Sequence, residues 1–119
     1  MAFVLKQSDT YMWPVTLVIP VDGGRREKHS FDAEFKRLSQ TRINEIVRQA
    51  KGTSEEEATL EDQTACAEIL VGWSNVVDDD GQDIPFSQKS LGQLLELPTI
   101  AAQIIRAWSE SLEVAKRKN

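Results

Sequence analysis

Apolar and polar residues alternate through the first third of the chain with the period of a β-strand. Every second position from Trp13 to Val21 is apolar, and a period of two places these side chains on one face of a strand. Pro14 and Pro20 stand between them. Proline has no N–H to give to a sheet ladder, so we expect this strand at the edge of its sheet. The apolar face consists of Trp13, Val15, Leu17, Ile19 and Val21.

A turn and a second alternation follow this strand. The segment Asp22-Gly23-Gly24 is typical of a tight turn between antiparallel strands. Beyond it, apolar residues again alternate with polar ones, at Phe31, Ala33 and Phe35. The pattern predicts a β-hairpin over residues 12–36 with one buried face. The apolar residues 3–5 are expected to add a short third strand.

From residue 39 onwards the apolar spacing changes to that of helices. We expect Ser39 as the N-cap of a first helix that ends at Gly52, with Leu38 forming a hydrophobic staple onto Ile43. The buried stripe of this helix consists of Ile43, Ile46, Val47 and Ala50.

A second helix is predicted from the capping box at residues 54–57 to about Val77. It is apolar on two sides, which indicates a central position between neighbours. A polar turn at residues 78–83 follows, and then a short helix capped by Ser87. Pro98 fits the first turn of a last helix, over about residues 98–116. The short helix buries Leu91, Leu94 and Leu95, and Phe86 staples onto Leu91.

These elements define an α+β fold. Its N-terminal β-hairpin or small antiparallel sheet, within residues 1–38, packs on a C-terminal bundle of about four helices, within residues 39–119. The chain has 119 residues, of which 40% are hydrophobic and 28% charged, and this suits a single domain, 1–119, with one modest core.

Charge and cysteine content narrow the classes of partner. The formal net charge is −5, and a negative protein repels phosphate backbones and anionic lipid, so neither nucleic acid nor a membrane is expected as a partner. The single cysteine, Cys66, allows no internal disulfide and suits a reducing cytoplasm. The N-terminal residues do not resemble a signal peptide, and we expect the protein to stay where it is made.

Residues that could carry chemistry are few. His29 is the only histidine and stands near a turn with no marked partner, while Cys66 lies among apolar residues as an inert thiol would. No Cys/His set could hold zinc. An EF-hand loop placed with Gly81 at its sixth position has Val76 and Ser87 where calcium needs carboxylates, which favours a solvated turn. We therefore expect no cofactor, no metal and no enzymatic activity.

The last helix has an apolar arc of about 180°, and a one-sided surface helix needs only about 100°. Two interpretations stay open. The extra width could contact a partner or a second copy, or the small domain could bury it between its own elements. On the first interpretation the partner-binding residues are Ile100, Ile104, Ile105, Trp108 and Leu112.

Residues 69–112 resemble a known family. The segment Ile69-Leu70-Val71-Gly72-Trp73-Ser74-Asn75-Val76 is followed by Asp80-Gly81-Gln82-Asp83-Ile84-Pro85-Phe86-Ser87 and then by the leucines, Pro98 and Trp108. This order is similar to that of the tail assembly chaperones of long-tailed bacteriophages, the lambda-like gene G-product group. In that family a helix ending in a tryptophan motif leads through such a loop into a leucine-rich turn and a last helix.

The resemblance implies a role. The protein would bind and solubilise the tape measure protein, the long helical rod that sets tail length, and aid recruitment of the tail tube protein. It would work as a homo-oligomer in the host cytoplasm and be absent from the mature virion. The competing hypothesis is a small regulatory binding protein, either antitoxin-like or an inhibitor of a host enzyme.

Overall fold

The computed structural model describes residues 2–49 and 55–113, and it confirms the α+β class. An antiparallel sheet contains β1 (Thr10–Val21), β2 (Arg25–Lys36) and β3 (Leu70–Ser74), in that order. Four helices lie in the described ranges: α1 (Gln40–Gln49), α2 (Glu55–Ile69), α3 (Gln88–Leu95) and α4 (Ile100–Leu112). None of them is long and apolar enough to cross a membrane.

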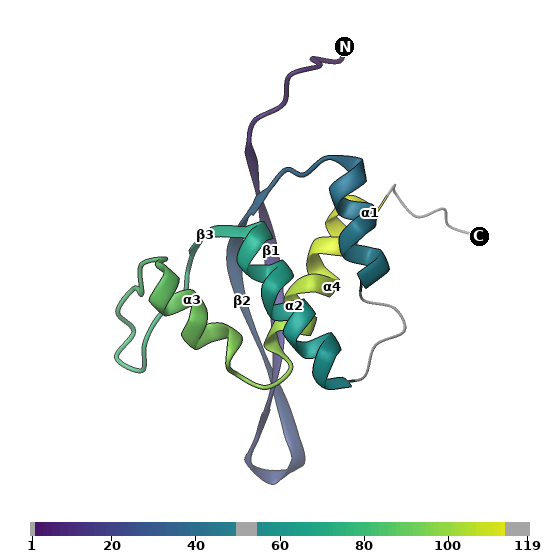
Figure 1. The fold of residues 1–119 in the computed structure, drawn as a ribbon. Coiled ribbons are helices and arrows are strands. Elements are labelled where there is room, and N and C mark those ends of the chain that lie inside the picture. Colours follow the sequence, from purple (N-terminus) through teal and green to yellow (C-terminus); the bar gives the residue numbers. More distant parts are fainter. Residues whose placement is uncertain (1, 50–54, 114–119) are drawn as a thin grey trace, which may run out of the picture.

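The predicted hairpin is confirmed, and it is slightly longer than expected. β1 and β2 pair from Thr10↔Lys36 to Val21↔Arg25, and a short 3₁₀ turn, Asp22–Gly24, joins them. Gly23 and Gly24 have φ angles of 82° and 75°, in the left-handed region that favours glycine. The hairpin tip extends beyond the helices (Figure 1), and residues 22–30 are exposed.

β1 is the edge strand, as its prolines predict. The backbone N–H and C=O of Val18 both bond to the side chain of Gln103 in α4, so they point away from β2. Backbone groups alternate in direction along a strand, and positions 14 and 20 share the orientation of position 18. The N–H groups that Pro14 and Pro20 lack would therefore face outward, and their absence removes no bond to β2.

The prediction of the third strand was wrong. Residues 3–5 lie outside the sheet with their side chains 66–88% exposed, and β3 takes the position instead. The helix predicted to run to Val77 ends at Ile69, and β3 takes up residues 70–74 of its last part, so the region 39–119 is not wholly helical. Trp73 therefore belongs to a strand rather than to the helix end that the family resemblance implied.

Pairing with β2 explains this difference. Ala33 lies opposite Trp73 and Phe35 opposite Leu70, so by joining the sheet the segment buries Leu70 and half-buries Trp73. Gly72 weakens a helix at this point. In the strand, Gly72 lies so close to the side chain of Glu34 that a Cβ at this position would clash with the carboxylate. Tertiary pairing therefore outweighs the local helical pattern.

The core lies where helices cover the sheet. α2 and α4 pack side by side, and α4 also packs against β1 (Figure 1). The predicted inward face of the hairpin is confirmed at its centre, because Val15, Phe31 and Phe35 are at most 5% exposed. The largest fully buried side chains are Trp108, Phe35, Ile69, Leu70, Leu91, Ile100, Ile104, Val15 and Cys66.

α1 begins as predicted. The Ser39 hydroxyl accepts a bond from the Arg42 backbone N–H at 3.1 Å, so Ser39 is the N-cap, and Leu38 and Ile43 are both half-buried against the core. Arg42 pairs with Glu68 of α2, with an Nη2–Oε1 distance of 2.6 Å. The predicted helix end at Gly52 and the capping box at residues 54–57 involve residues outside the described part.

α3 begins where it was predicted, whereas α4 is shorter than predicted. Ser87 and Ser90 form a capping box at the start of α3, and Leu91 and Leu95 are buried, as expected. α4 begins at Ile100 rather than at Pro98, because Thr99 precedes it with a positive φ of 67°. It ends at Leu112, because Glu113 is extended, with φ −70° and ψ 140°, so the prediction of a helix to about residue 116 was wrong at this end as well. Residues 114–116 lie outside the described part.

Candidate functional site

The five partner-binding residues predicted on α4 fall into two groups. Ile100, Ile104 and Trp108 are at most 1% exposed, so for them the second interpretation holds: the domain buries them between its own elements. Ile105 is half-buried, and Leu112 is 42% exposed. Contact of these two residues with a partner stays a prediction.

The accessible residues of α4 face α1 across an apolar surface. The stripe of α1 is only partly covered, since Ile46 is buried and Ile43 half-buried while Val47 is 44% exposed. The apolar stripe of α1 is wider than the part that contacts the core, so some of its apolar area is exposed to solvent. We call this region the α1–α4 surface; it consists of Ile43, Ile46, Val47, Ile105, Trp108 and Leu112.

Two hollows lie in the α1–α4 surface. One, of about 190 Å³, is lined by apolar side chains of α1, α2 and α4, including Val47, Ala65 and Ile105. The other, of about 350 Å³, lies toward the end of α4 and includes Tyr11, Ile43 and Leu112 in its lining. The Trp108 side chain lines both. The two hollows therefore share a wall, which this core side chain forms from below.

Two carboxylates of α2, Glu61 and Asp62, line the smaller hollow. Oε2 of Glu61 is closed off from solvent and has no hydrogen-bond partner. Burial raises the pKa of Asp62. In the described ranges neither residue forms an ion pair. A buried oxygen without a donor is unfavourable, so a movement of the Glu61 side chain that brought this oxygen to a donor in the hollow would be stabilising.

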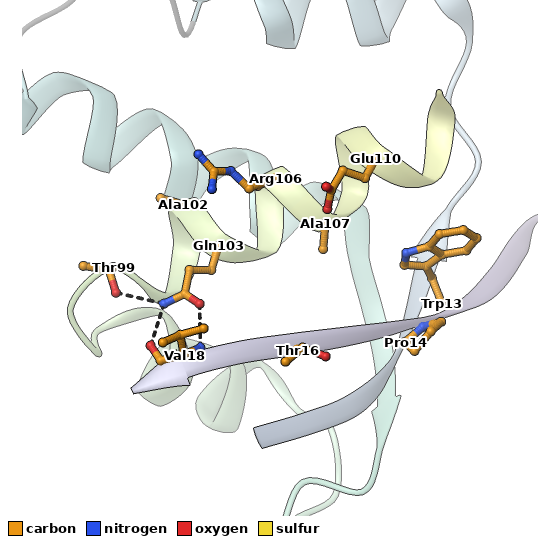
Figure 2. Close-up of a pocket in the computed structure, with 10 residues that line it drawn as sticks. All are labelled: Trp13, Pro14, Thr16, Val18, Thr99, Ala102, Gln103, Arg106, Ala107 and Glu110. Carbon is orange, nitrogen blue, oxygen red and sulfur yellow. Dashed lines mark hydrogen bonds between the residues drawn. The ribbon is translucent and has the colours of Figure 1, made fainter. Parts of the chain in front are cut away.

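A second groove, of about 480 Å³, runs between the free edge of β1 and α4 (Figure 2). Gln103 closes one end: its Oε1 accepts the Val18 N–H at 2.7 Å, and its Nε2 donates to the Val18 carbonyl at 3.0 Å. Trp13 and Glu110 lie at the other end. Gln103 acts here as a short substitute for a neighbouring strand, which protects an edge that could otherwise pair with another chain. Sequence periodicity gives no signal for this role.

The residues considered for catalysis do not come together. His29 lies on the exposed hairpin, and its Nε2 is 3.2 Å from Oε1 of Glu27. Cys66 is buried, its thiol lies 3.4 Å from the carbonyl of Ala101, and burial raises its pKa to about 12. A thiol with that pKa is protonated at neutral pH and is a poor nucleophile. The absence of enzymatic activity stays a prediction.

The acidic turn after β3 has the geometry of a side-chain-stabilised loop. Oδ1 of Asp78 accepts the backbone N–H groups of Asp80 and Gln82, at 2.9 and 3.0 Å. Asp78, Asp79 and Asp80 are all exposed, although their carboxylates come within 4.8 Å of one another. This arrangement agrees with a solvated turn.

The described chain thus combines a small helix-covered sheet with an accessible apolar surface, which is an architecture of binding proteins as well as of many other classes. Residues 27–119 match the family model of the YdaY prophage protein. The match spans most of the chain, so the protein belongs to this family and is a prophage protein. No curated protein and no solved structure matches the chain.

Proposed function

We propose that this prophage protein is a tail assembly chaperone, which binds and solubilises the tape measure protein and aids recruitment of tail tube subunits in the host cytoplasm. The observation that carries the proposal is the α1–α4 surface: an apolar area with two hollows on a protein of net charge −5. Membership of a prophage family and the resemblance of residues 69–112 to tail assembly chaperones support it.

The physical need for such a protein is clear. A long helical rod exposes an apolar stripe before its tail is assembled, and exposed apolar area promotes aggregation. A surface between two helices suits a third helix, which would lay its apolar face into the groove. The negative charge of the chaperone would keep the complex soluble.

Co-expression tests the proposal. A tape measure protein from the same prophage is produced alone, with the wild-type chain, and with a Val47→Asp/Leu112→Asp double variant. We expect the wild-type chain to keep the rod in the soluble fraction and the double variant to lose most of that effect, because two charges would enter the apolar surface. Truncation of α4 is unsuitable as a test, since Ile104 and Trp108 belong to the core.

Leu60→Asp is the matched control, because Leu60 is 64% exposed on α2 and does not line either hollow. It should solubilise the rod as the wild type does. If the rod is equally soluble without this protein, the proposal is wrong. A tight complex with one host enzyme in place of the rod would favour the competing hypothesis of a regulatory inhibitor.

A further inference from the structure

We infer that the α1–α4 surface binds an amphipathic helix that carries a lysine or arginine beside its apolar stripe, and that this cation is seated in the smaller hollow against Glu61 and Asp62. The inference rests on the proposed function and adds the chemistry of the segment that is bound.

The size and lining of the smaller hollow fit one long side chain. Its volume is about 190 Å³, and a cavity of roughly 150 Å³ accommodates a benzene-sized group. Apolar walls from Ile46, Val47 and Ile105 lie beside the two carboxylates. Lysine and arginine have this same division, with an apolar stem and a charged head, so one such side chain would contact both parts of the lining.

Among the residues that the structure describes, Glu61 and Asp62 have no cationic partner. No lysine or arginine is among the described residues that line the hollow. Arg42 of α1 is held by Glu68 and Glu45. An incoming ammonium or guanidinium group would donate charge-assisted hydrogen bonds to Glu61 and Asp62, and such bonds are about twice as strong as neutral ones.

A second copy of this chain is a poorer occupant. If two copies met through the same surface with the two-fold axis near the smaller hollow, Glu61 and Asp62 of the two copies would lie close together, and like charges repel. An added β-strand is also disfavoured, because Gln103 covers Val18 and the prolines interrupt the row of donors on the free edge of β1. A basic amphipathic helix meets neither obstacle.

Two labelled peptides provide the test. Both are 18-residue helices with the same leucine stripe; one carries lysine at the positions flanking the stripe, and the other carries glutamine there. Affinity is measured by fluorescence anisotropy with the full-length protein. We expect the lysine peptide to bind about tenfold more tightly, because tenfold corresponds to about 1.4 kcal/mol, the range of one charge-assisted hydrogen bond.

Two double variants distinguish the effect of the carboxylates in the hollow from the effect of the overall negative charge of the protein. Glu61→Gln/Asp62→Asn should abolish the tenfold preference and keep the affinity for the glutamine peptide. Asp79→Asn/Asp80→Asn, which removes the same charge from the exposed turn, should retain the preference. Both substitutions preserve side-chain shape, and circular dichroism verifies the fold. In the wild type, carboxyl NMR should show that the lysine peptide lowers the pKa of Asp62, because a nearby cation favours the charged carboxylate, and that the glutamine peptide does not.

Each outcome has a distinct meaning. If both peptides bind equally well, the surface binds helices but the inference about the cation is wrong. If the preference survives in Glu61→Gln/Asp62→Asn, the charge that matters lies elsewhere, and the inference is again wrong. If neither peptide binds, the inference is wrong, and the co-expression test still decides the proposed function separately. Dimerisation of the peptide-free protein that Val47→Asp abolishes would replace the helix by a second copy as the occupant.

Discussion

At the scale of single residues, Trp73 joins segments that are far apart in the sequence. Its ring packs edge-on against Phe31 of β2 and Phe86 of the loop before α3, with centroids 6.4 and 5.0 Å away. Its indole N–H donates to the carbonyl of Ile84 at 2.8 Å. One side chain thereby fixes β3 to both its neighbour in the sheet and the loop that leads to α3.

Replacing Trp73 by alanine should be strongly destabilising. We expect Trp73→Ala to lower the free energy of unfolding by roughly 3–5 kcal/mol, because the ring contacts and the indole hydrogen bond are lost together. Urea unfolding followed by circular dichroism measures the change. Val71→Ala on the same strand is the control, with a much smaller effect since Val71 is 37% exposed. A loss below 1 kcal/mol for Trp73→Ala would contradict this account.

The residues of the candidate site were harder to predict than the core. Alternation alone identified Val15, Phe31 and Phe35 as inward-facing, because a strand has only two faces. The roles of Glu61 and Gln103 depend on what other elements bring next to them, and no local pattern reports that. The same limit applies to Trp108, whose apolar character was evident but whose burial depends on how α2 and the sheet pack around it.

At the scale of elements, α1 is attached to the rest of the fold at few points. Ile46 is its buried side chain, and Arg42 binds both carboxylate oxygens of Glu68 on α2, with Nε–Oε2 at 2.9 Å and Nη2–Oε1 at 2.6 Å. This ion pair fixes the helix that forms one wall of the α1–α4 surface. Its geometry is bidentate, and the two side chains are 35% and 29% exposed.

The ion pair should make stability depend on pH. The hydrogen bonds from Arg42 lower the pKa of Glu68 in the folded state. A lowered pKa stabilises the fold at pH values above the ordinary glutamate pKa, about 4.3, and this stabilisation is lost as the pH falls through the folded-state pKa. Glu68→Gln should therefore be less stable than the wild type at pH 7, with the gap closing in acid.

Urea unfolding at pH 7 and at pH 3 measures that gap. Glu45→Gln is the comparison, because Glu45 also contacts Arg42 but through one bond and at 49% exposure, and its effect should be smaller. A gap between wild type and Glu68→Gln that is unchanged in acid would show that the carboxylate charge contributes nothing.

The elements differ in how far local sequence determines them. The hairpin was predicted because its turn and both alternations lie within one continuous stretch of the chain. β3 was missed because residues 70–74 become a strand by pairing with β2, where Ser74 lies opposite Asp32. Apolar residues on two sides of a predicted helix were therefore a sign of a change of element inside it.

At the scale of the whole molecule, the N-terminal arm, residues 2–6, extends away from the body (Figure 1). Phe3, Val4 and Leu5 are 78%, 66% and 88% exposed. Their side chains add little to the folded core but do add apolar area to the surface.

Removal of residues 2–6 should leave the fold stable. We expect a change in the free energy of unfolding within about 0.5 kcal/mol, as for other surface changes, together with less self-association at high concentration. Urea unfolding and sedimentation velocity measure the two effects. Leu17→Ala, at a core position, is the contrasting variant and should cost about 2–5 kcal/mol. A similar loss on removing the arm would place it in the folded core.

The shield that Gln103 provides has a consequence for translation. Gln103 binds Val18 although it lies 85 positions further along the polypeptide. A ribosome makes the hairpin early and this amide late, so the strand edge is bare for most of synthesis. A product released by premature termination before codon 103 never acquires its cover. In such fragments only Pro14 and Pro20 would limit pairing at this edge, so the fragments would pair edge to edge and be degraded more readily than the finished chain.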